Sequence, residues 1–259
     1  MVKQDLINLS PVRFFDDIAD GGLKAGQLGL ITAKKGLGKT SVLVQLGIDA
    51  LIQDKQLVHV SFDQHSSNVI SWYNSILAEI GKKKNLGDTS ELNDSIVRER
   101  TILNFNQETF SMPKVVNTIK ALKEGGITVS ALIIDGADMS KISAADLKTV
   151  SDFVQAEKIT AWFSDTNESS SLSETLTKET LPLFATVAHL ESNGNSVVLK
   201  VLKANGKEAD GESVKLDSKT LLMTKSFSET VKCALKKHIK KSCMQRIQLF
   251  FVSQYDISW

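Results

Sequence analysis

The chain has 259 residues, of which 42% are hydrophobic and 24% charged, with 15 glycines and only 3 prolines; this composition excludes disordered, collagen-like and proline-rich proteins. Its 31 lysines and arginines balance 30 acidic residues, so the net charge of +1 provides no chain-wide attraction to nucleic acid or to an acidic membrane. The length suits one large α/β domain with its own core.

Five short apolar runs, rich in β-branched residues, alternate with longer amphipathic stretches. Strands of a parallel sheet are buried on both faces and read as near-continuous apolar runs, and alternation with helices is typical of crossover connections. The sequence therefore predicts an α/β fold with a mostly parallel sheet flanked by helices. The predicted strands are residues 28–33, 57–62, 101–105, 131–134 and 159–163, and the predicted helices are residues 39–53, 67–80, 113–124 and 143–157.

Residues 81–96 interrupt this alternation. Three lysines at 82–84 are followed by a stretch rich in Gly, Asp, Thr, Ser and Asn, which is typical of a mobile surface loop. We expect a solvated connection in preference to a contact with polyphosphate or nucleic acid.

From Phe184 onward the pattern changes to short strands separated by turns. The strands are expected at 185–190, 196–202 and 213–216, and Asn-Gly pairs occur at Asn193-Gly194 and Asn205-Gly206. Because Asn-Gly is a strong short-range signal for a β-hairpin, the sheet is expected to end in an antiparallel hairpin extension.

A glycine-rich segment between the first strand and the first long helix matches a phosphate-binding loop, except that Ala33 replaces the usual first glycine. Gly36 and Gly38 stand where side chains would obstruct backbone N–H groups around a phosphate. Lys39 would reach the β- and γ-phosphates, and the Thr40 hydroxyl would ligate Mg²⁺. The predicted nucleotide-binding residues are Lys34, Lys35, Gly36, Leu37, Gly38, Lys39, Thr40 and Ser41.

A second element of a nucleotide site is an acidic residue at the end of a buried strand, where it holds the Mg²⁺ shell. Asp135 follows the apolar run 131–134 and fits this role, whereas Asp138 fits a helix cap equally well. Residues 164–166, Ser-Asp-Thr, end the next strand, where they either sense a γ-phosphate or cap a turn.

The chain resembles the RecA superfamily of ATPases, and within it the KaiC and DnaB-like branch, over roughly residues 12–222. The resemblance implies a RecA-like ATPase core in residues 1–225 that binds ATP and Mg²⁺ and assembles into homo-oligomers with nucleotide at subunit interfaces. The segments that carry it are Asp20-Gly21-Gly22-Leu23-Lys24-Ala25-Gly26-Gln27-Leu28, the phosphate loop, Val60-Ser61-Phe62-Asp63, Asp135 and Leu202-Lys203-Ala204-Asn205-Gly206.

Two departures from the family pattern indicate slow or partner-activated hydrolysis. The family's water-orienting glutamate corresponds to Asp63 and Gln64, and a positioning error of about 1 Å can cost roughly 100-fold in rate. Asp63 is the candidate base, or else an acid at a helix start. In the late hairpin Lys203 matches a family cation offered to the neighbouring subunit, or is an ordinary surface lysine, while Asn205 replaces the family's arginine.

The loop is also similar to the deviant phosphate loop of the MinD and ParA ATPases, in which a first lysine crosses a dimer interface. Lys34 matches that lysine, but Lys35 replaces the glycine that follows it. Lys34 and Lys35 otherwise add positive potential near the phosphates.

Residues 226–259 are expected to form a basic tail, with an amphipathic helix over 230–241 and an apolar segment after it. The helix packs on its own domain or contacts nucleic acid, an acidic protein or a membrane surface. Cys233 and Cys243 form no disulfide framework or Cys-x-x-Cys pair, so we expect a reducing compartment and no metal besides Mg²⁺. With no signal peptide or apolar span of about 18–20 residues, a cytoplasmic protein without integral membrane contact is predicted.

Three functions remain open from the sequence. The first is an Mg-ATP-dependent ATPase, with Lys39, Asp63, Asp135 and Lys203 as its catalytic candidates and adenine preferred because no Asn-Lys-x-Asp guanine motif occurs. The second is an ATP-dependent switch or scaffold that does not hydrolyse ATP. The third is a DNA-associated recombination or helicase-like accessory ATPase.

Overall fold

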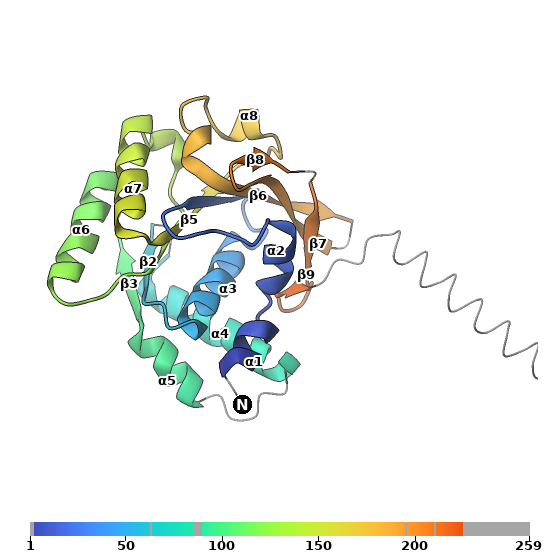
Figure 1. Ribbon diagram of the computed structural model, residues 1–259. Helices are drawn as coiled ribbons and strands as arrows, with labels where there is room; N and C mark the ends of the chain where they lie inside the picture. The colour runs from blue at the N-terminus through green and yellow to red at the C-terminus, as the bar shows by residue number, and fades with distance from the viewer. Residues whose placement is uncertain (1–2, 63, 85–89, 195, 210, 225–259) are drawn as a thin grey trace, which may run out of the picture. The chain divides into compact units, whose positions relative to one another are not determined.

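The predicted α/β architecture is confirmed: ten strands of the described chain form one sheet, with helices on both faces (Figure 1). The computed structural model describes residues 3–62, 64–84, 90–194, 196–209 and 211–224. The chain divides into two units, Met1–Thr224 and Lys225–Trp259. The predicted basic tail and both cysteines belong to the second unit and lie outside the described residues.

The strands in chain order are β1 (Leu28–Ala33), β2 (Leu57–Ser61), β3 (Arg100–Asn104), β4 (Ala131–Asp135), β5 (Thr160–Thr166), β6 (Phe184–Asn193), β7 (Ser196–Ala204), β8 (Lys207–Glu208), β9 (Ser213–Leu216) and β10 (Met223–Thr224). Across the sheet their order is β10-β9-β7-β6-β1-β5-β4-β2-β3, with β8 beside β7. Neighbours from β6 to β3 run parallel, and β7 to β10 are joined by antiparallel pairing. The predicted hairpin extension is therefore confirmed.

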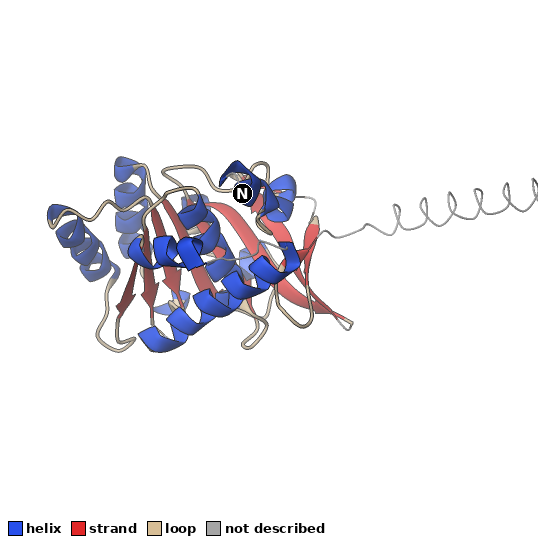
Figure 2. Cartoon of the chain, turned by 90° about the horizontal axis from the view of Figure 1, so that it is seen from below, coloured by secondary structure: helices blue, strands red, loops and turns tan. Residues whose placement is uncertain are grey.

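The helices are α1 (Lys3–Leu9), α2 (Arg13–Ile18), α3 (Lys39–Ile52), α4 (Ser66–Lys84), α5 (Ser90–Arg98), α6 (Met112–Glu124), α7 (Ala144–Glu157) and α8 (Leu172–Thr175), with 3-10 turns at Met139–Lys141 and Leu181–Leu183. α6 and α7 lie side by side on one face of the sheet, and α3 and α4 lie together on the other (Figure 1). Figure 2 shows the strands between these helical layers. No helix in the described ranges combines the length and apolar character needed to cross a bilayer.

Strand β1 lies inside the sheet and contributes to the core on both faces. Leu28 and Leu30 pack with α6 and α7, while Ile31 and Ala33 pack with α3 and α4. Since successive side chains of a strand point to opposite faces, an unbroken apolar sequence is what this position requires.

Gly29 makes room for an aromatic ring on the α3 face. It pairs in register with Trp162 of β5, and a Cβ atom at position 29 would lie 2.4 Å from two atoms of the Trp162 ring. The same indole meets Phe15 of α2 edge-on, with ring centroids 5.8 Å apart. Because Gly29 has no side chain, the Trp162 ring fits beside β1, and its contact with Phe15 holds α2 against this face of the sheet.

The predicted surface loop over residues 81–96 is wrong where the structure describes it. Helix α4 continues to Lys84, and α5 begins at Ser90; residues 85–89 lie outside the described chain. Leu92 and Ile96 stand four residues apart on α5, and both pack against the core on the α3 face. The apolar contacts of this one helical face stabilise a helix in an otherwise polar sequence.

Gly29→Ala is expected to lower the free energy of unfolding by about 1–3 kcal/mol, because the added methyl group overpacks against Trp162. Urea denaturation of the wild type and the variant measures this. In a Trp162→Leu background the same substitution should cost clearly less, since the obstructing ring is gone. An equal cost in both backgrounds would contradict the packing explanation.

Candidate functional site

The loop from β1 to α3 turns sharply at two glycines. Gly36 and Gly38 have φ values of +87° and +101°, and Gly38 directly precedes the first residue of α3. A side chain at either position would be strained in this left-handed conformation. The first turn of α3 contains no acidic residue. Its N-terminal N–H groups, which lack helical acceptors, are therefore suited to an anion.

Lys39 spans the loop with its ammonium group. Its Nζ donates to the carbonyl oxygen of Ala33 at 3.3 Å and to the hydroxyl of Thr166 at 3.0 Å. These partners are the paired last residues of β1 and β5. The positive charge therefore lies at the carboxyl edge of the parallel sheet, which is where ligands bind in open α/β sheets.

Asp135 ends β4 and is held by two hydroxyl groups. Thr40 Oγ1 donates to Asp135 Oδ2 at 2.9 Å, and Ser164 Oγ donates to Asp135 Oδ1 at 2.6 Å. Burial raises the pKa of Asp135, while these two hydrogen bonds and the nearby Lys39 partly offset that rise. Asp135 is therefore a nearly buried carboxylate whose negative charge is only partly stabilised by its neighbours.

The Thr40 hydroxyl and the Asp135 carboxylate fit Mg²⁺, because both provide oxygen ligands and already lie within hydrogen-bond distance of each other. No group of three or more His, Cys, Asp or Glu side chains that could hold a metal occurs among the residues that the structure describes. Mg²⁺ is commonly held by one or two protein ligands with substrate phosphates and water completing its shell, so a two-ligand site is sufficient.

A cleft of about 740 Å³ surrounds these groups. This volume lies within the range of about 300–1,000 Å³ that is usual for small-molecule sites. The loop after β1, the start of α3, the ends of β4 and β5 and the segments after β2 and β3 line it, α4 contributes one side chain, and the turn before β10 contributes another. The lining residues are Lys35, Gly36, Gly38, Lys39, Thr40, Ser41, Gln64, Trp72, Gln107, Asp135, Gly136, Ala137, Asp138, Asp165, Thr166 and Leu221.

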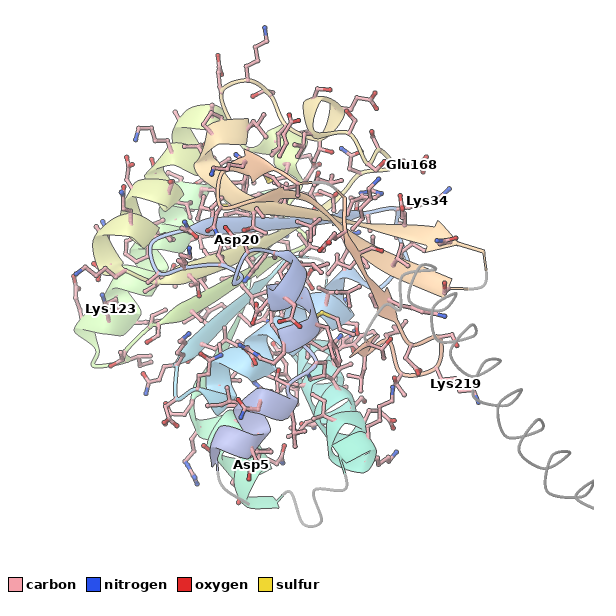
Figure 3. The ribbon with its side chains drawn as sticks, turned by 45° about the vertical axis from the view of Figure 1, so that its right-hand side comes forward. Asp5, Asp20, Lys34, Lys123, Glu168 and Lys219 are labelled. Atoms are coloured by element: carbon pink, nitrogen blue, oxygen red, sulfur yellow. The ribbon has the colours of Figure 1, made fainter. Side chains whose placement is uncertain are left out.

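Two residues of the predicted loop do not line the cleft. Lys34 is 66% exposed and forms an ion pair with Glu168 at 3.5 Å, and Figure 3 shows both side chains at the surface. Leu37 packs against the core on the α3 face. An exposed ion pair contributes little to stability. Lys34 is therefore a suitable control for the role of charge in this loop.

The three residues at the end of β5 that were predicted to face a ligand do not all reach the cleft. Asp165 and Thr166 line the cleft, while Ser164 lies behind Asp135 and accepts a hydrogen bond from the Gly136 N–H at 2.9 Å. Asp138 lines the cleft and also caps the short turn that follows, accepting from Ser140 N–H at 3.1 Å.

Of the two other predicted catalytic residues, only Lys203 is described, and it does not line the cleft. Asp63 lies outside the described residues. Lys203 is only 6% exposed, and its Nζ donates to the carbonyl oxygen of Leu181 at 2.6 Å. Burial lowers the pKa of Lys203. Asn205, at the position where the resemblance led us to expect an arginine, donates to both the carbonyl and the carboxylate of Asp20 at 2.8 and 2.7 Å.

Leu221 also lines the cleft, and its contacts were not predicted from the sequence. Its carbonyl oxygen accepts from Ser41 Oγ at 3.4 Å and from Gln45 Nε2 at 3.0 Å. The side-chain oxygen Oε1 of Gln45 in turn accepts from Met223 N–H at 2.8 Å. The sequence signal for these contacts was a glutamine, Gln45, on the buried face of a predicted helix. Its partners, Leu221 and Met223, lie more than 170 residues away in the chain.

Trp72 and Gln107 were also missed. Trp72 lies on α4, where an aromatic residue is more often part of the core, and it reaches both the core and the cleft. Gln107 follows β3, and its Nε2 donates to the carbonyl oxygen of Gly136 at 2.9 Å. The only sequence signal for Gln107 was its place just beyond a predicted strand.

Comparison with protein-family models and with curated proteins gives no match to this chain. The chemistry of the cleft must therefore be inferred from its own residues. Those residues combine a lysine and a helix N-terminus for an anion, a hydroxyl and a carboxylate for a hard cation, and one aromatic side chain.

Asp135→Asn is expected to raise the free energy of unfolding of the ligand-free protein at neutral pH. Because burial raises the folded-state pKa of Asp135, ionisation of this carboxyl costs stability as the pH rises through that pKa. Asparagine does not ionise, so the advantage of the variant should disappear below about pH 4, where the wild-type carboxyl is protonated in both states. Urea denaturation across this pH range measures it.

Asp138→Asn provides a control with the opposite sign. Hydrogen bonds from Ser140 lower the pKa of Asp138, so this carboxylate stabilises the fold at neutral pH and its neutral variant should be slightly less stable. A variant at Asp135 that is less stable than the wild type at pH 7 would contradict the assignment of an undercompensated buried charge.

Proposed function

We propose that this protein is a RecA-like ATPase that binds Mg-ATP in the cleft around Lys39 and turns it over slowly. The observation that carries the proposal is the convergence of Lys39, Thr40 and Asp135 at the start of one helix. Cation, hydroxyl and carboxylate are the three groups that a magnesium nucleotide requires.

Each group has a role set by its position. N–H groups of the loop and of the α3 N-terminus bind the β-phosphate, and Lys39 exchanges its contacts with Ala33 and Thr166 for phosphate oxygens. Thr40 and Asp135 hold Mg²⁺, directly or through water. Bound Mg²⁺ neutralises charge on the phosphates and on Asp135.

The apolar part of the cleft wall suits a nucleobase. Trp72 and Leu221 are the large apolar side chains in the cleft wall, and every base can stack on an aromatic face. Adenine remains the preferred base because the sequence has no Asn-Lys-x-Asp segment.

A second candidate is a switch that binds Mg-ATP without turning it over and signals through assembly or a partner. The observation that favours it is the neutral Gln64 in contact with Thr40, at a position where the related ATPases have a carboxylate. Lys203 and Asn205 both bond within their own chain, so an activating cation would come from another protein. Homo-oligomerisation with nucleotide at the interface belongs to the same proposal.

Lys39→Ala is expected to weaken Mg-ATP binding by about 10- to 100-fold, the cost of one charge-assisted hydrogen bond to phosphate. Isothermal titration calorimetry measures the affinity, and phosphate release measures turnover, which should vanish in the variant. Lys34→Ala, which removes an exposed lysine from the same loop, should change the affinity by less than about threefold. Equal affinities of Lys39→Ala and the wild type would contradict the proposed site.

Trp72→Ala is expected to weaken binding of Mg-ATP by about 10-fold or more, because stacking on a base contributes about 1–3 kcal/mol. Binding of magnesium tripolyphosphate, which has no base, should not change. Loss of affinity for both ligands would show that Trp72 supports the fold of the cleft rather than stacking on the base.

A further inference from the structure

One arginine is shared by two carboxylates where α2 meets α3. Arg13 of α2 forms an ion pair at 2.8 Å with Asp16, one turn further along the same helix, and a second ion pair with Asp49 on α3. The two pairs use different nitrogens of the guanidinium group, Nη1 for Asp16 and Nη2 for Asp49. Two negative charges therefore compete for one positive charge. These three residues form the Arg13 cluster.

The charges of the Arg13 cluster are buried and incompletely paired. The side chain of Asp49 is 8% exposed and that of Asp16 is 21% exposed. Asp49 Oδ2 also accepts from Gln53 Nε2 at 2.6 Å, but Asp49 Oδ1 and Arg13 Nε have no hydrogen-bond partner within the described part of the chain. Because a buried charge is stabilised only by good pairing and full hydrogen bonding, the contact between α2 and α3 carries an electrostatic cost.

A polar cavity of about 190 Å³ adjoins the cluster at the amino edge of the sheet. The starts of β2, β4 and β5 line it, together with α2, the second half of α3 and the loop before β1. Its charged lining residues are Arg13, Asp16, Asp49 and Lys55. A cavity of this size admits several water molecules, so the cluster can exchange protons with solvent at the edge of the sheet opposite the candidate nucleotide cleft.

The charged groups that act on Asp16 come from α2, α3 and the turn after α3. Burial has the largest effect and raises the pKa of Asp16 to about 6. Arg13 opposes this rise, Asp49 and Asp17 add to it, and Lys55 opposes it more weakly. An aspartate in an unfolded chain has a pKa of about 3.9, so the folded protein holds this proton more tightly.

The other elements around Asp16 bring no charge to it. β9 and β10 pack against α2 and contribute Val214, Leu216 and Met223 to the core on this face (Figure 1). The loop before β1 approaches through Gly22, where a side chain would collide with the Asp16 carboxylate. Asp16 therefore has little room for the water that would stabilise its charge.

We propose that the Arg13 cluster is a proton-sensitive contact, in which proton uptake by Asp16 tightens the attachment of α2 to α3. The proton comes from solvent and stays on the Asp16 carboxyl group. Its uptake removes one of the two charges that compete for Arg13, so the guanidinium group pairs with the more deeply buried Asp49 alone. The inference concerns the amino edge of the sheet and does not depend on the proposed nucleotide site.

The direction of the pH effect follows from the tighter proton binding in the folded state. The stabilising effect of the proton is complete below about pH 4 and is lost as the pH rises through about 6. α2 also carries Phe15, whose ring meets Trp162 of β5. Weaker attachment of α2 at neutral pH therefore extends to this aromatic contact.

The titration of Asp16 can be followed directly. NMR detection of its side-chain carboxyl carbon, from about pH 3 to pH 8, should give a midpoint near pH 6 in the wild type. Arg13→Gln removes the shared cation and should raise the midpoint further, because the carboxylate loses its positive neighbour. A wild-type midpoint below about pH 4.5, close to that of an ordinary aspartate, would overturn the proposal.

Amide hydrogen exchange in α2 tests the consequence for its attachment. From pH 5 to pH 7.5 the protection factors of its hydrogen-bonded amides should fall by about 10-fold or more in the wild type. In Asp16→Asn they should stay constant within about threefold, since asparagine cannot ionise. Comparison of the two proteins cancels the titration of Asp135, which both contain.

Asp17→Asn is the matched control, because it makes the same chemical change at the next residue of α2, which is exposed. It should keep a pH dependence close to that of the wild type. Equal pH dependence in the wild type and Asp16→Asn would overturn the proposal, as would loss of the dependence in Asp17→Asn alone. If Asp16→Asn does not fold, the wild type decides: a midpoint near pH 6 with pH-dependent protection of α2 supports the proposal, and constant protection overturns it.

Discussion

Parallel pairing of β1, β5, β4 and β2 is the constraint on which the cleft depends. The register sets Ala33 beside Thr166 and Ser61 beside Asp135, so the loop after β1, the carboxylate that ends β4 and the segment after β2 all leave the sheet at one edge. A register slip of one residue would turn Asp135 to the opposite face of the sheet. The two apolar cores prevent such a slip, because it would also move every buried side chain of a strand to the wrong face.

This arrangement lowers the stability of the ligand-free protein at Asp135, where it buries a charged side chain. The carboxylate is almost completely buried, and two hydroxyl groups and a nearby lysine compensate its charge only in part. Such a group destabilises the ligand-free protein and gains compensation when a cation binds. In the proposed magnesium site, stability and cation binding would therefore be coupled through Asp135, and a neutral side chain there would favour the fold at the expense of cation binding.

Local sequence patterns predicted much of this structure. The continuous apolar runs identified β1, β2, β4 and β5, and the Asn-Gly pairs identified the hairpins, because burial and turn geometry act over a few residues. The glycine-rich segment predicted Lys39 and Thr40, and the end of an apolar run predicted Asp135; the structure brings these three side chains together in one cleft. The Leu221 contact and the inward bond of Lys203 were not predictable, because each depends on partners set by tertiary packing. Helix α5 was missed for the same reason, since Leu92 and Ile96 stabilise it only when the core is present.

The most direct test of the account is a crystal structure with Mg²⁺ and a non-hydrolysable ATP analogue. The account predicts the β-phosphate within the loop of residues 34–38, Lys39 Nζ turned from Thr166 to the phosphates, and Thr40 Oγ1 at about 2.1 Å from Mg²⁺. The base would stack on Trp72. A nucleotide bound elsewhere on the protein would contradict it. So would a nucleotide bound in the cleft while Lys39 Nζ keeps its hydrogen bond to Thr166.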